Sequence, residues 1–304
     1  MKKTKIKKIL ISAANGTIMP ELITHLKKYF YVIGIDSNEI GLAKKYCDEF
    51  YKSPPGKDIK FIKFLEKIGK KVDMIFLFVD EELDVVSKNI HKLNKIKNKI
   101  ILSPLETINI CNNKLQFEKF FGKFKNIKLP TFKKNKKNII KPKIGRGSKN
   151  IFISGNQKII NNFHVDKNFI VQEYIKGTEY TVDCLFDKNG ELIFSLPRER
   201  LVAQNVSIVG KIVKNRKINN FIELIGSKLN FYGPVNVQII INKDQLYLIE
   251  INPRLSGSII FSIKSGFDPI RTLFKIQKNK KHKINDNKID YNKSFYRFLK
   301  SVSI

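Results

Sequence analysis

The segment of residues 234–258, PVNVQIIINKDQLYLIEINPRLSGS, constrains the fold of this chain more than any other. Two runs rich in β-branched and aliphatic residues flank a short polar stretch at Asn242, Lys243 and Asp244, which predicts a β-hairpin. Side chains alternate between the two faces of a strand, so residues two apart share a face. The polar residues within these runs should therefore gather on one side of the hairpin.

That polar side carries three amides and a carboxylate. Asn236 and Gln238 share a face of the first strand, and Glu250 and Asn252 share a face of the second. Oxygen ligands of this kind suit a hard cation such as Mg²⁺, which keeps several waters and accepts phosphate oxygens as further ligands. The alternative interpretation is an ordinary hairpin whose polar side faces solvent.

The register of the hairpin decides which of these side chains meet. If the loop holds three residues, Asn242 pairs with Leu246, and Gln238 then lies opposite Glu250. Arg254 comes two residues after Asn252, where its guanidinium could neutralise charge on a phosphoryl group. The sequence thus predicts a patch of Gln238, Glu250 and Asn252 that holds a metal ion.

Composition bounds the class of protein. The chain has 304 residues, of which 42% are hydrophobic and 11% aromatic, so it can form sizeable cores and is not a disordered chain. Its 58 Lys and Arg against 27 Asp and Glu give a formal charge of +31, which raises nucleic-acid binding as a possible function. Lysine is spread along the whole chain and forms no patch interleaved with aromatic residues, so we expect no specific nucleic-acid partner.

The cysteines and the apolar runs indicate a cytoplasmic protein. The three cysteines are few and far apart, which predicts buried, reduced thiols rather than disulfides or a zinc site; they are Cys47, Cys111 and Cys184. The apolar run 9–14 near the amino terminus is too short for an export signal, and no run reaches the length of a membrane span. We expect no membrane association.

The first third of the chain alternates predicted strands and helices. Buried strands are expected at 7–14, 31–36, 72–79 and 99–103, with helices between them. This alternation predicts a parallel, doubly wound sheet over residues 1–104. The turn around Gly16 carries one glycine where a dinucleotide-binding loop carries three, so it is a weak nucleotide site.

A second glycine-rich turn lies in the middle of the chain. Gly145-Arg146-Gly147-Ser148 joins two expected strands and presents backbone amides that can cradle phosphates. Lys141 precedes this turn and can add a positive charge. A surface hairpin would show the same residues, so the turn is informative only together with its neighbours.

Four motifs follow one another in the order of a known superfamily. They are Asn112-Asn113-Lys114, IIKPKIGRGSKNIFI, VQEYIKGTEYTVD and VNVQ followed by EINPR. Together they resemble the ATP-grasp enzymes, most closely the branch of the carbamoyl phosphate synthase large subunit. The resemblance implies a pre-ATP-grasp domain over 1–104, a linker helix and small lobe with a glycine-rich flap over 105–186, and a large lobe with the metal site over 187–304.

The resemblance also implies a nucleotide site. It assigns ATP binding to Lys114, Lys141, Gly145, Gly147, Ser148, Gln172, Glu173, Ile175 and Glu179. The two lysines would contact phosphates, backbone groups of the hinge would meet the adenine, and Glu179 would accept from the ribose hydroxyls. Gln172 departs from the family pattern, in which glutamate is more usual, but an amide oxygen can also accept from the adenine amino group. Gln238, Glu250 and Asn252 would hold one or two Mg²⁺ or Mn²⁺ ions.

The chemistry implied is carboxylate–amine ligation. Similar enzymes transfer the γ-phosphoryl group of ATP to a carboxylate, and an amine then displaces phosphate. Arg254, and with it Arg198 or Arg200, would neutralise charge on the transferred group. Arg198 and Arg200 share a face of an extended segment, where they form either an anion clamp or an exposed, ion-paired edge.

Three other functions remain open at this point. The same residues would serve a kinase that stops at the phosphorylated acid, an ATP sensor without turnover, or a basic protein that binds nucleic acid. We expect a stand-alone ligase with small-molecule carboxylate and amine substrates, and a homodimer is possible.

Overall fold

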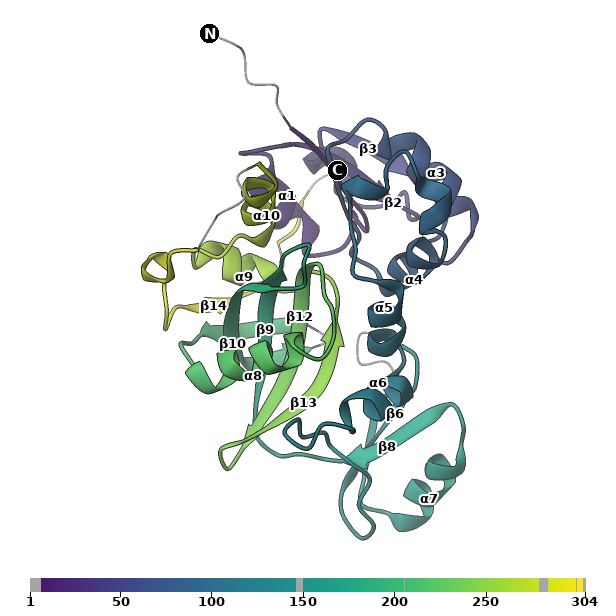
Figure 1. The fold of residues 1–304 in the computed structure, drawn as a ribbon, viewed down its shortest axis with the longest axis vertical. Helices are drawn as coiled ribbons and strands as arrows, with labels where there is room; N and C mark the ends of the chain where they lie inside the picture. Colours follow the sequence, from purple (N-terminus) through teal and green to yellow (C-terminus); the bar gives the residue numbers. More distant parts are fainter. Residues whose placement is uncertain (1–6, 146–149, 205, 279–283, 299, 303–304) are drawn as a thin grey trace. The chain divides into compact units, whose positions relative to one another are not determined.

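The computed structural model describes residues 7–145, 150–204, 206–278, 284–298 and 300–302 (Figure 1). The described chain divides into two compact units, with the boundary after Ile108. The first unit contains the amino-terminal part of the chain, and the second runs from Asn109 to Phe298. Gly147 and Ser148, predicted to bind phosphate, lie outside the described residues.

The first unit is built on a parallel five-stranded sheet in the order β3-β2-β1-β4-β5. The strands are β1 (Lys8–Ile11), β2 (Tyr31–Asp36), β3 (Glu49–Lys52), β4 (Met74–Phe76) and β5 (Ile100–Ile101). The helices between them are α1 (Met19–Leu26), α2 (Ala43–Tyr46), α3 (Lys60–Gly69) and α4 (Asp80–Lys88), followed by 3₁₀ turns at Ile90–Leu93 and Lys97–Lys99. The predicted parallel sheet is confirmed. Strand β3 was not predicted, because its sequence EFYK lies at the sheet edge and lacks a buried apolar run.

Two helices, rather than one, follow the first sheet. The single linker helix expected in this part of the chain is wrong, because the structure has two helices: α5 (Leu105–Asn112) and α6 (Lys114–Phe121), separated at Asn113. Asn113 has an extended backbone, and its side chain accepts hydrogen bonds from the first turn of α6, at 3.0 Å from Leu115 N and 3.2 Å from Gln116 N. An Asn in this position caps a new helix instead of continuing the old one.

A small antiparallel sheet of three strands follows, in the order β7-β6-β8. Its strands are β6 (Asn138–Pro142), β7 (Phe152–Ser154) and β8 (Phe169–Glu173), and the helix α7 (Gln157–Val165) covers it. Ile140, Ile160 and Val171 form the small core between helix and sheet. Helix α7 was not predicted.

The larger sheet has six antiparallel strands in the order β13-β12-β9-β10-β11-β14. They are β9 (Thr178–Phe186), β10 (Leu192–Gln204), β11 (Val206–Ile212), β12 (Gly233–Asn242), β13 (Gln245–Asn252) and β14 (Ser294–Tyr296). Strand β10 is long, so that Arg198 and Arg200 lie within a strand between two neighbours. Strand β11 was not predicted.

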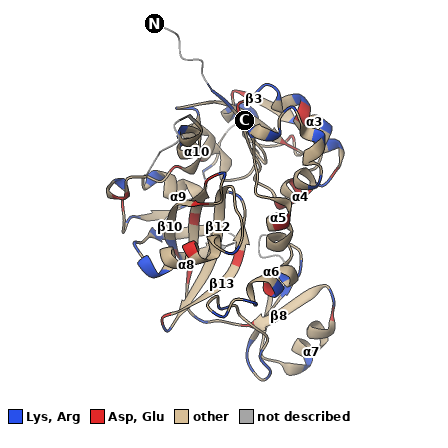
Figure 2. Cartoon of the chain, viewed as in Figure 1, with Lys and Arg blue, Asp and Glu red and all other residues tan. Residues whose placement is uncertain are grey.

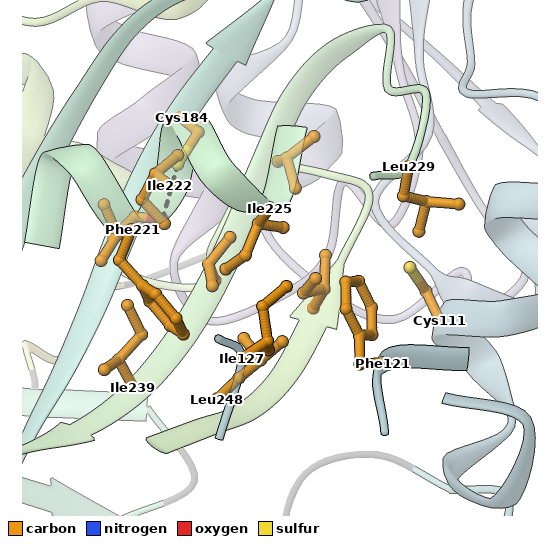
Figure 3. Close-up of a cluster of buried hydrophobic side chains, with 14 of the residues drawn as sticks. Cys111, Phe121, Ile127, Cys184, Phe221, Ile222, Ile225, Leu229, Ile239 and Leu248 are labelled. Atoms are coloured by element: carbon orange, nitrogen blue, oxygen red, sulfur yellow. Dashed lines mark hydrogen bonds between the residues drawn. The ribbon is translucent and has the colours of Figure 1, made fainter. Parts of the chain in front are cut away.

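The two faces of this sheet differ. One face packs its apolar residues on α8 (Arg216–Gly226), and Figure 3 shows Ile222 and Ile225 of that helix among the buried side chains of this core. The other face is polar, and α9 (Ile259–Lys264) lies against part of it, because Ser262 Oγ donates a 2.5 Å hydrogen bond to Asp183 on β9. Helix α10 (Pro269–Lys278) and a 3₁₀ turn at Asp286–Lys288 complete the unit.

Two predictions about the whole chain can be compared with the structure. All three cysteines are free and buried, as predicted. Within the described part of the chain, no helix combines the length and apolar character needed to cross a membrane.

Candidate active site

The hairpin β12–β13 places Gln238 opposite Glu250, as the sequence predicted, but by a different route. The loop holds two residues rather than three, and Asn242 pairs with Gln245. Lys243 and Asp244 both have positive φ angles, 45° and 64°, as two-residue hairpin turns require. A register shift between Gln238 and Ile239 then restores the pairing of Gln238 with Glu250.

The register of the larger sheet brings polar residues from four strands into transverse rows. Gln238 lies between Glu250 on β13 and Thr181 on β9, and Thr181 pairs in turn with Arg198 on β10. In the next row, Asn236 lies between Asn252 and Asp183.

Hydrogen bonds fix the end of this hairpin. Asn252 Nδ2 donates to Glu250 Oε1 at 2.7 Å, and Arg254 Nη2 donates to Asn252 Oδ1 at 3.2 Å. Arg254 Nη1 also donates to the carbonyl of Leu255 at 3.2 Å. The guanidinium of Arg254 is thus held beside the predicted metal ligands.

The oxygen atoms of this patch fit a hard cation. The set contains one carboxylate and several amides. The described part of the chain contains no group of three His, Cys, Asp or Glu side chains that could hold a metal. Asn236 Oδ1 is buried beside Asn252, and no donor among the described residues reaches it. An orphaned buried oxygen is costly, and a bound cation would satisfy it. The residues present therefore fit Mg²⁺, with phosphate oxygens supplying the remaining negative charge.

The predicted phosphate-binding Lys141 comes from the small sheet. Its side chain is on β6 and only 6% of it is exposed. Burial, with a smaller contribution from the charge of Lys114, lowers the pKa of Lys141 to about 8, whereas Glu250 and Glu118 act in the opposite direction. Glu250 lies on the larger sheet, so the fold brings Lys141 into the electrostatic range of the predicted metal ligand.

Lys114 is held at the start of the glycine-rich turn. Its backbone N donates to Lys143 O at 3.0 Å, and its Nζ donates to Gly145 O at 3.0 Å. Gly145 has a φ of 147°, in the region that favours glycine. The first turn of α6 is therefore attached to the end of β6, next to Lys141.

Glu118 belongs to this group of charges and was missed in the sequence. It lies one turn after Lys114 on α6, so both side chains share a face of the helix. Burial raises the pKa of Glu118, while Lys141 and a hydrogen bond from Gln172 oppose that rise. The four-residue spacing from Lys114 was the only signal in the sequence that could have indicated it.

The predicted adenine-binding segment lies on β8 and the hinge after it. Gln172 is buried, and no described donor reaches its Oε1. The carboxylate of Glu173 forms ion pairs with Lys133 at 3.0 Å and Lys136 at 3.2 Å. Successive strand residues face opposite sides, so the side chain of Glu173 points away from that of Gln172. Ile175 is buried in the hinge.

The two predicted arginines of β10 have separate carboxylate partners. Arg198 is fully buried and contacts Asp183 at 3.3 Å, Ser207 Oγ at 2.8 Å and Ser256 Oγ at 3.4 Å. Arg200 forms an ion pair with Glu179 and is mostly buried. Both arginines are ion-paired, as one of the two alternatives stated, but they do not lie at an exposed edge, because β10 runs between β9 and β11 and both side chains are largely buried.

Part of the chain is similar in sequence to known proteins. Residues 165–294 match the family described as "ATP-grasp in the biosynthetic pathway with Ter operon". Tyramine–L-glutamate ligase of Methanocaldococcus jannaschii is 31% identical over 123 residues, which is 39% of each chain. The enzyme of the same name from Methanocaldococcus fervens is 31% identical over 140 residues, 44% of this chain and 42% of the relative. The matched segment thus spans about two-fifths of the length of these curated relatives.

Solved structures share the fold of the chain. N5-carboxyaminoimidazole synthetase from Staphylococcus aureus, complexed with ADP, has a TM-score of 0.70 at 16% identity, covering 90% of this chain and 78% of that one. L-amino acid ligase from Bacillus licheniformis has a TM-score of 0.67 at 14% identity, covering 90% and 74%. Residues 165–294 are thus similar to an ATP-grasp family, and the chain shares its fold with these two enzymes.

Proposed function

We propose that the chain is a Mg²⁺- and ATP-dependent ligase that joins a carboxylate to an amine. The observation that carries the proposal is that Lys141 on the small sheet lies within electrostatic range of both Lys114 on α6 and Glu250 on the larger sheet. Two cations and the proposed metal-ligating carboxylate thus come from three separate elements. In the proposed reaction the γ-phosphoryl group passes to a carboxylate oxygen, giving an acyl phosphate and ADP. An amine then attacks the acyl carbon, and phosphate leaves with the C–O bond electrons.

The phosphate-binding roles follow from the chemistry of the two lysines. Burial lowers the pKa of Lys141, and a polyphosphate beside it would stabilise the ammonium form. Lys114 is held by the carbonyl of Gly145, at the start of the glycine-rich turn. In this proposal, Glu179 accepts from the ribose, Gln172 accepts from the adenine amino group, and the backbone of Glu173 and Ile175 lines the base.

The metal would be held by Gln238, Glu250 and Asn252. When bound, Mg²⁺ supplies charge neutralisation on the transferred phosphoryl group. Arg254, hydrogen-bonded to Asn252, places a further positive charge at the same end of the hairpin. Positioning and charge neutralisation are the main contributions that phosphoryl transfer requires of a protein.

The arginines of β10 would have different roles from Arg254. Arg198 is buried and contacts Ser256, so it positions the segment after the hairpin instead of contacting the phosphoryl group. Arg200 is paired with Glu179, and its guanidinium lies nearer the proposed ribose site.

The names of the relatives supply the first substrates to test. The carboxylate and the amine are small molecules in this proposal, and L-glutamate with tyramine is the first pair to test because two relatives carry that name. The experiment incubates the full chain with Mg²⁺, ATP and this pair, then with pools of amino acids, small acids and amines, and quantifies ADP, AMP and phosphate.

Matched variants make the result specific. Glu250→Gln removes the one carboxylate of the proposed metal set, and Glu223→Gln removes an exposed carboxylate on α8. Pool-dependent ADP and phosphate that persist in Glu223→Gln and disappear in Glu250→Gln would support the ligase. AMP and pyrophosphate would contradict an acyl phosphate mechanism.

The same assay separates the other functions. A kinase that stops at the phosphorylated acid would give ADP without an amine, and hydroxylamine would trap its product. An ATP sensor would bind nucleotide without any turnover. Figure 2 shows Lys and Arg along helices and loops of both units. If this charge bound nucleic acid, the affinity for nucleic acid would fall with salt and would not change in Glu250→Gln.

A further inference from the structure

The polar face of the larger sheet continues past its last strand, β14, to Arg297. Gly210 on β11 pairs with Arg200 on β10 and with Phe295 on β14, so these three residues lie in one row on that face. Arg297 comes two residues after Phe295, and its backbone N donates to Ile208 O of β11 at 2.8 Å, which continues the pairing. Its side chain therefore leaves the sheet on the same face as that of Arg200.

Two arginines on this face hold the segment 255–258, which follows the β12–β13 hairpin. Arg198 Nη2 donates to Ser256 Oγ at 3.4 Å, and Arg297 Nη2 donates to Gly257 O at 3.1 Å. The segment is thus attached to the sheet at two successive residues, by one cation from β10 and another from the end of β14.

The ring of Phe261 on α9 lies against both of these arginines. Their guanidinium carbons are 5.6 Å (Arg198) and 5.3 Å (Arg297) from its centroid, and the ring of Phe295 stacks on it with 5.1 Å between centroids. Phe261 is buried. A Cβ at Gly210 would lie 3.2 Å from Arg198 Cδ, so this glycine leaves room for the Arg198 side chain to lie across β11. The two cations that hold the segment are therefore themselves packed in place.

Arg254 is oriented by the same segment. Its Nη1 donates to Leu255 O at 3.2 Å, and its Nη2 donates to Asn252 Oδ1 at 3.2 Å. Leu255 directly precedes Ser256, which Arg198 holds, so a shift of the segment would move the carbonyl that orients the Arg254 guanidinium. Misplacement of a reacting group by about 1 Å can cost about 100-fold in rate, so the position of this cation matters for phosphoryl transfer.

We propose that Arg297 is a positioning residue for Arg254. It holds the segment 255–258 through the Gly257 carbonyl, and the segment in turn orients the Arg254 guanidinium beside the proposed metal ligands. Arg297 lies outside residues 165–294, which match the family model, and outside the four motifs that resemble the ATP-grasp enzymes. The effect on turnover rests on the proposed function, whereas the anchoring of the segment does not.

Hydrogen exchange tests the anchoring without any substrate. Ser258 N donates to Ser256 Oγ and Ile259 N donates to Ser256 O, so these two amides report on the segment. In Arg297→Met they should exchange at least about 10-fold faster, the factor expected when a hydrogen bond from a charged donor is lost. Amides of β9 and β12 should keep their wild-type rates. Unchanged exchange in the segment, or faster exchange throughout this unit, would overturn the inference.

Turnover tests the consequence for the reaction. ADP release by the full chain is measured with Mg²⁺, ATP, L-glutamate and tyramine, or with the pair that the substrate pools identify. Arg297→Met should lower kcat about 10- to 100-fold and change the Kd for ATP by less than about threefold, because it misplaces Arg254 and not the nucleotide. Arg297→Lys keeps a charged donor and should recover part of kcat. Arg216→Met, the same exchange at an exposed arginine of α8, should change neither quantity.

A double-mutant cycle shows whether Arg297 acts through Arg254. If it does, adding Arg297→Met to Arg254→Met should lower kcat by less than about threefold further. Effects that multiply would overturn the inference, because Arg297 would then act on turnover independently of Arg254. If the wild-type chain binds ATP but turns over no pair, the proposed function falls and the effect on turnover falls with it, while the exchange rates still decide the anchoring.

Discussion

Gln238 lies directly opposite Glu250 across the β12–β13 hairpin, although the connecting loop holds only Lys243 and Asp244. With a two-residue loop and regular pairing, these two side chains would lie on opposite faces of the hairpin. The register shift between Gln238 and Ile239 supplies the correction, because two residues of β13 then occupy the space opposite one residue of β12. The irregularity thereby lets Leu248 and Ile251 of β13 both face the apolar core while Glu250 lies on the polar face with Gln238.

Removing the carboxylate of this pair should cost more than removing the amide. Glu250→Gln deletes the only charged ligand of the proposed metal set, whereas Gln238→Leu deletes a neutral one. Outer-shell partners of metal sites are typically worth 10- to 100-fold in affinity, so Glu250→Gln should raise the Mg²⁺ concentration for half-maximal turnover by at least about 100-fold. A titration of turnover against Mg²⁺ measures this, and an effect of Gln238→Leu equal to or larger than that of Glu250→Gln would contradict the assignment.

The buried amine of Lys141 should make stability rise with pH. Its pKa is lowered from 10.5 to about 8 in the folded protein, so between these values the unfolded chain binds more protons than the folded one. The free energy of unfolding should therefore increase as pH rises from about 8 to about 10.5, by at most about 3 kcal/mol for a group this buried. Lys141→Met removes this contribution.

The measurement for Lys141 is a difference. Urea unfolding of the wild type and of Lys141→Met at several pH values cancels the titration of the other lysines and tyrosines. The wild type should gain on the variant as pH rises through this window. A difference that is constant with pH, or that moves toward the variant, would show that Lys141 is not held in a buried environment.

The Arg198–Asp183 pair should behave as one unit. Both side chains are buried, and removing one partner leaves the other charge uncompensated, which typically costs about 3–5 kcal/mol. Arg198→Met and Asp183→Asn should each destabilise by about that amount, and the double variant by clearly less than the sum. The free energies come from denaturant unfolding curves; additive effects would show that the two residues do not interact.

Gly177 should not tolerate a methyl group. A Cβ added there would overlap the carbonyl oxygen of Ile241 and lie 2.8 Å from Ile240 Cγ2, because the chain entering β9 runs close to β12. Gly177→Ala should therefore lower the free energy of unfolding by about 1–3 kcal/mol, in the range of overpacking.

Gly155 provides the matched control for this substitution. A Cβ at Gly155 would meet nothing within 4 Å, so Gly155→Ala should change stability by no more than about 0.5 kcal/mol. Thermal unfolding of both variants gives the comparison. Equal effects at the two positions would show that the close approach of β12 does not cause the loss of stability.

Much of the architecture could be predicted from the sequence, because it depends on local periodicity. The alternation of strands and helices predicts the parallel sheet of the first unit, and the alternation of faces places Glu250 beside Asn252. The interruptions were harder to see. Asn113 divides one expected helix into two because its side chain caps α6, a competition between local hydrogen bonds that periodicity does not reveal.

Covalent geometry sets side-chain direction over short distances, so the sequence was enough to predict which residues share a strand face or a helix face. The tertiary structure alone decided which distant residues meet. It brings Lys141 into the electrostatic range of Glu250 and Glu118. It also forms the ion pairs of Arg198 with Asp183 and of Arg200 with Glu179. These partners are separated by long stretches of chain, and only the pairing of strands and the packing of α6 on the small sheet set their distances, since no local rule extends that far.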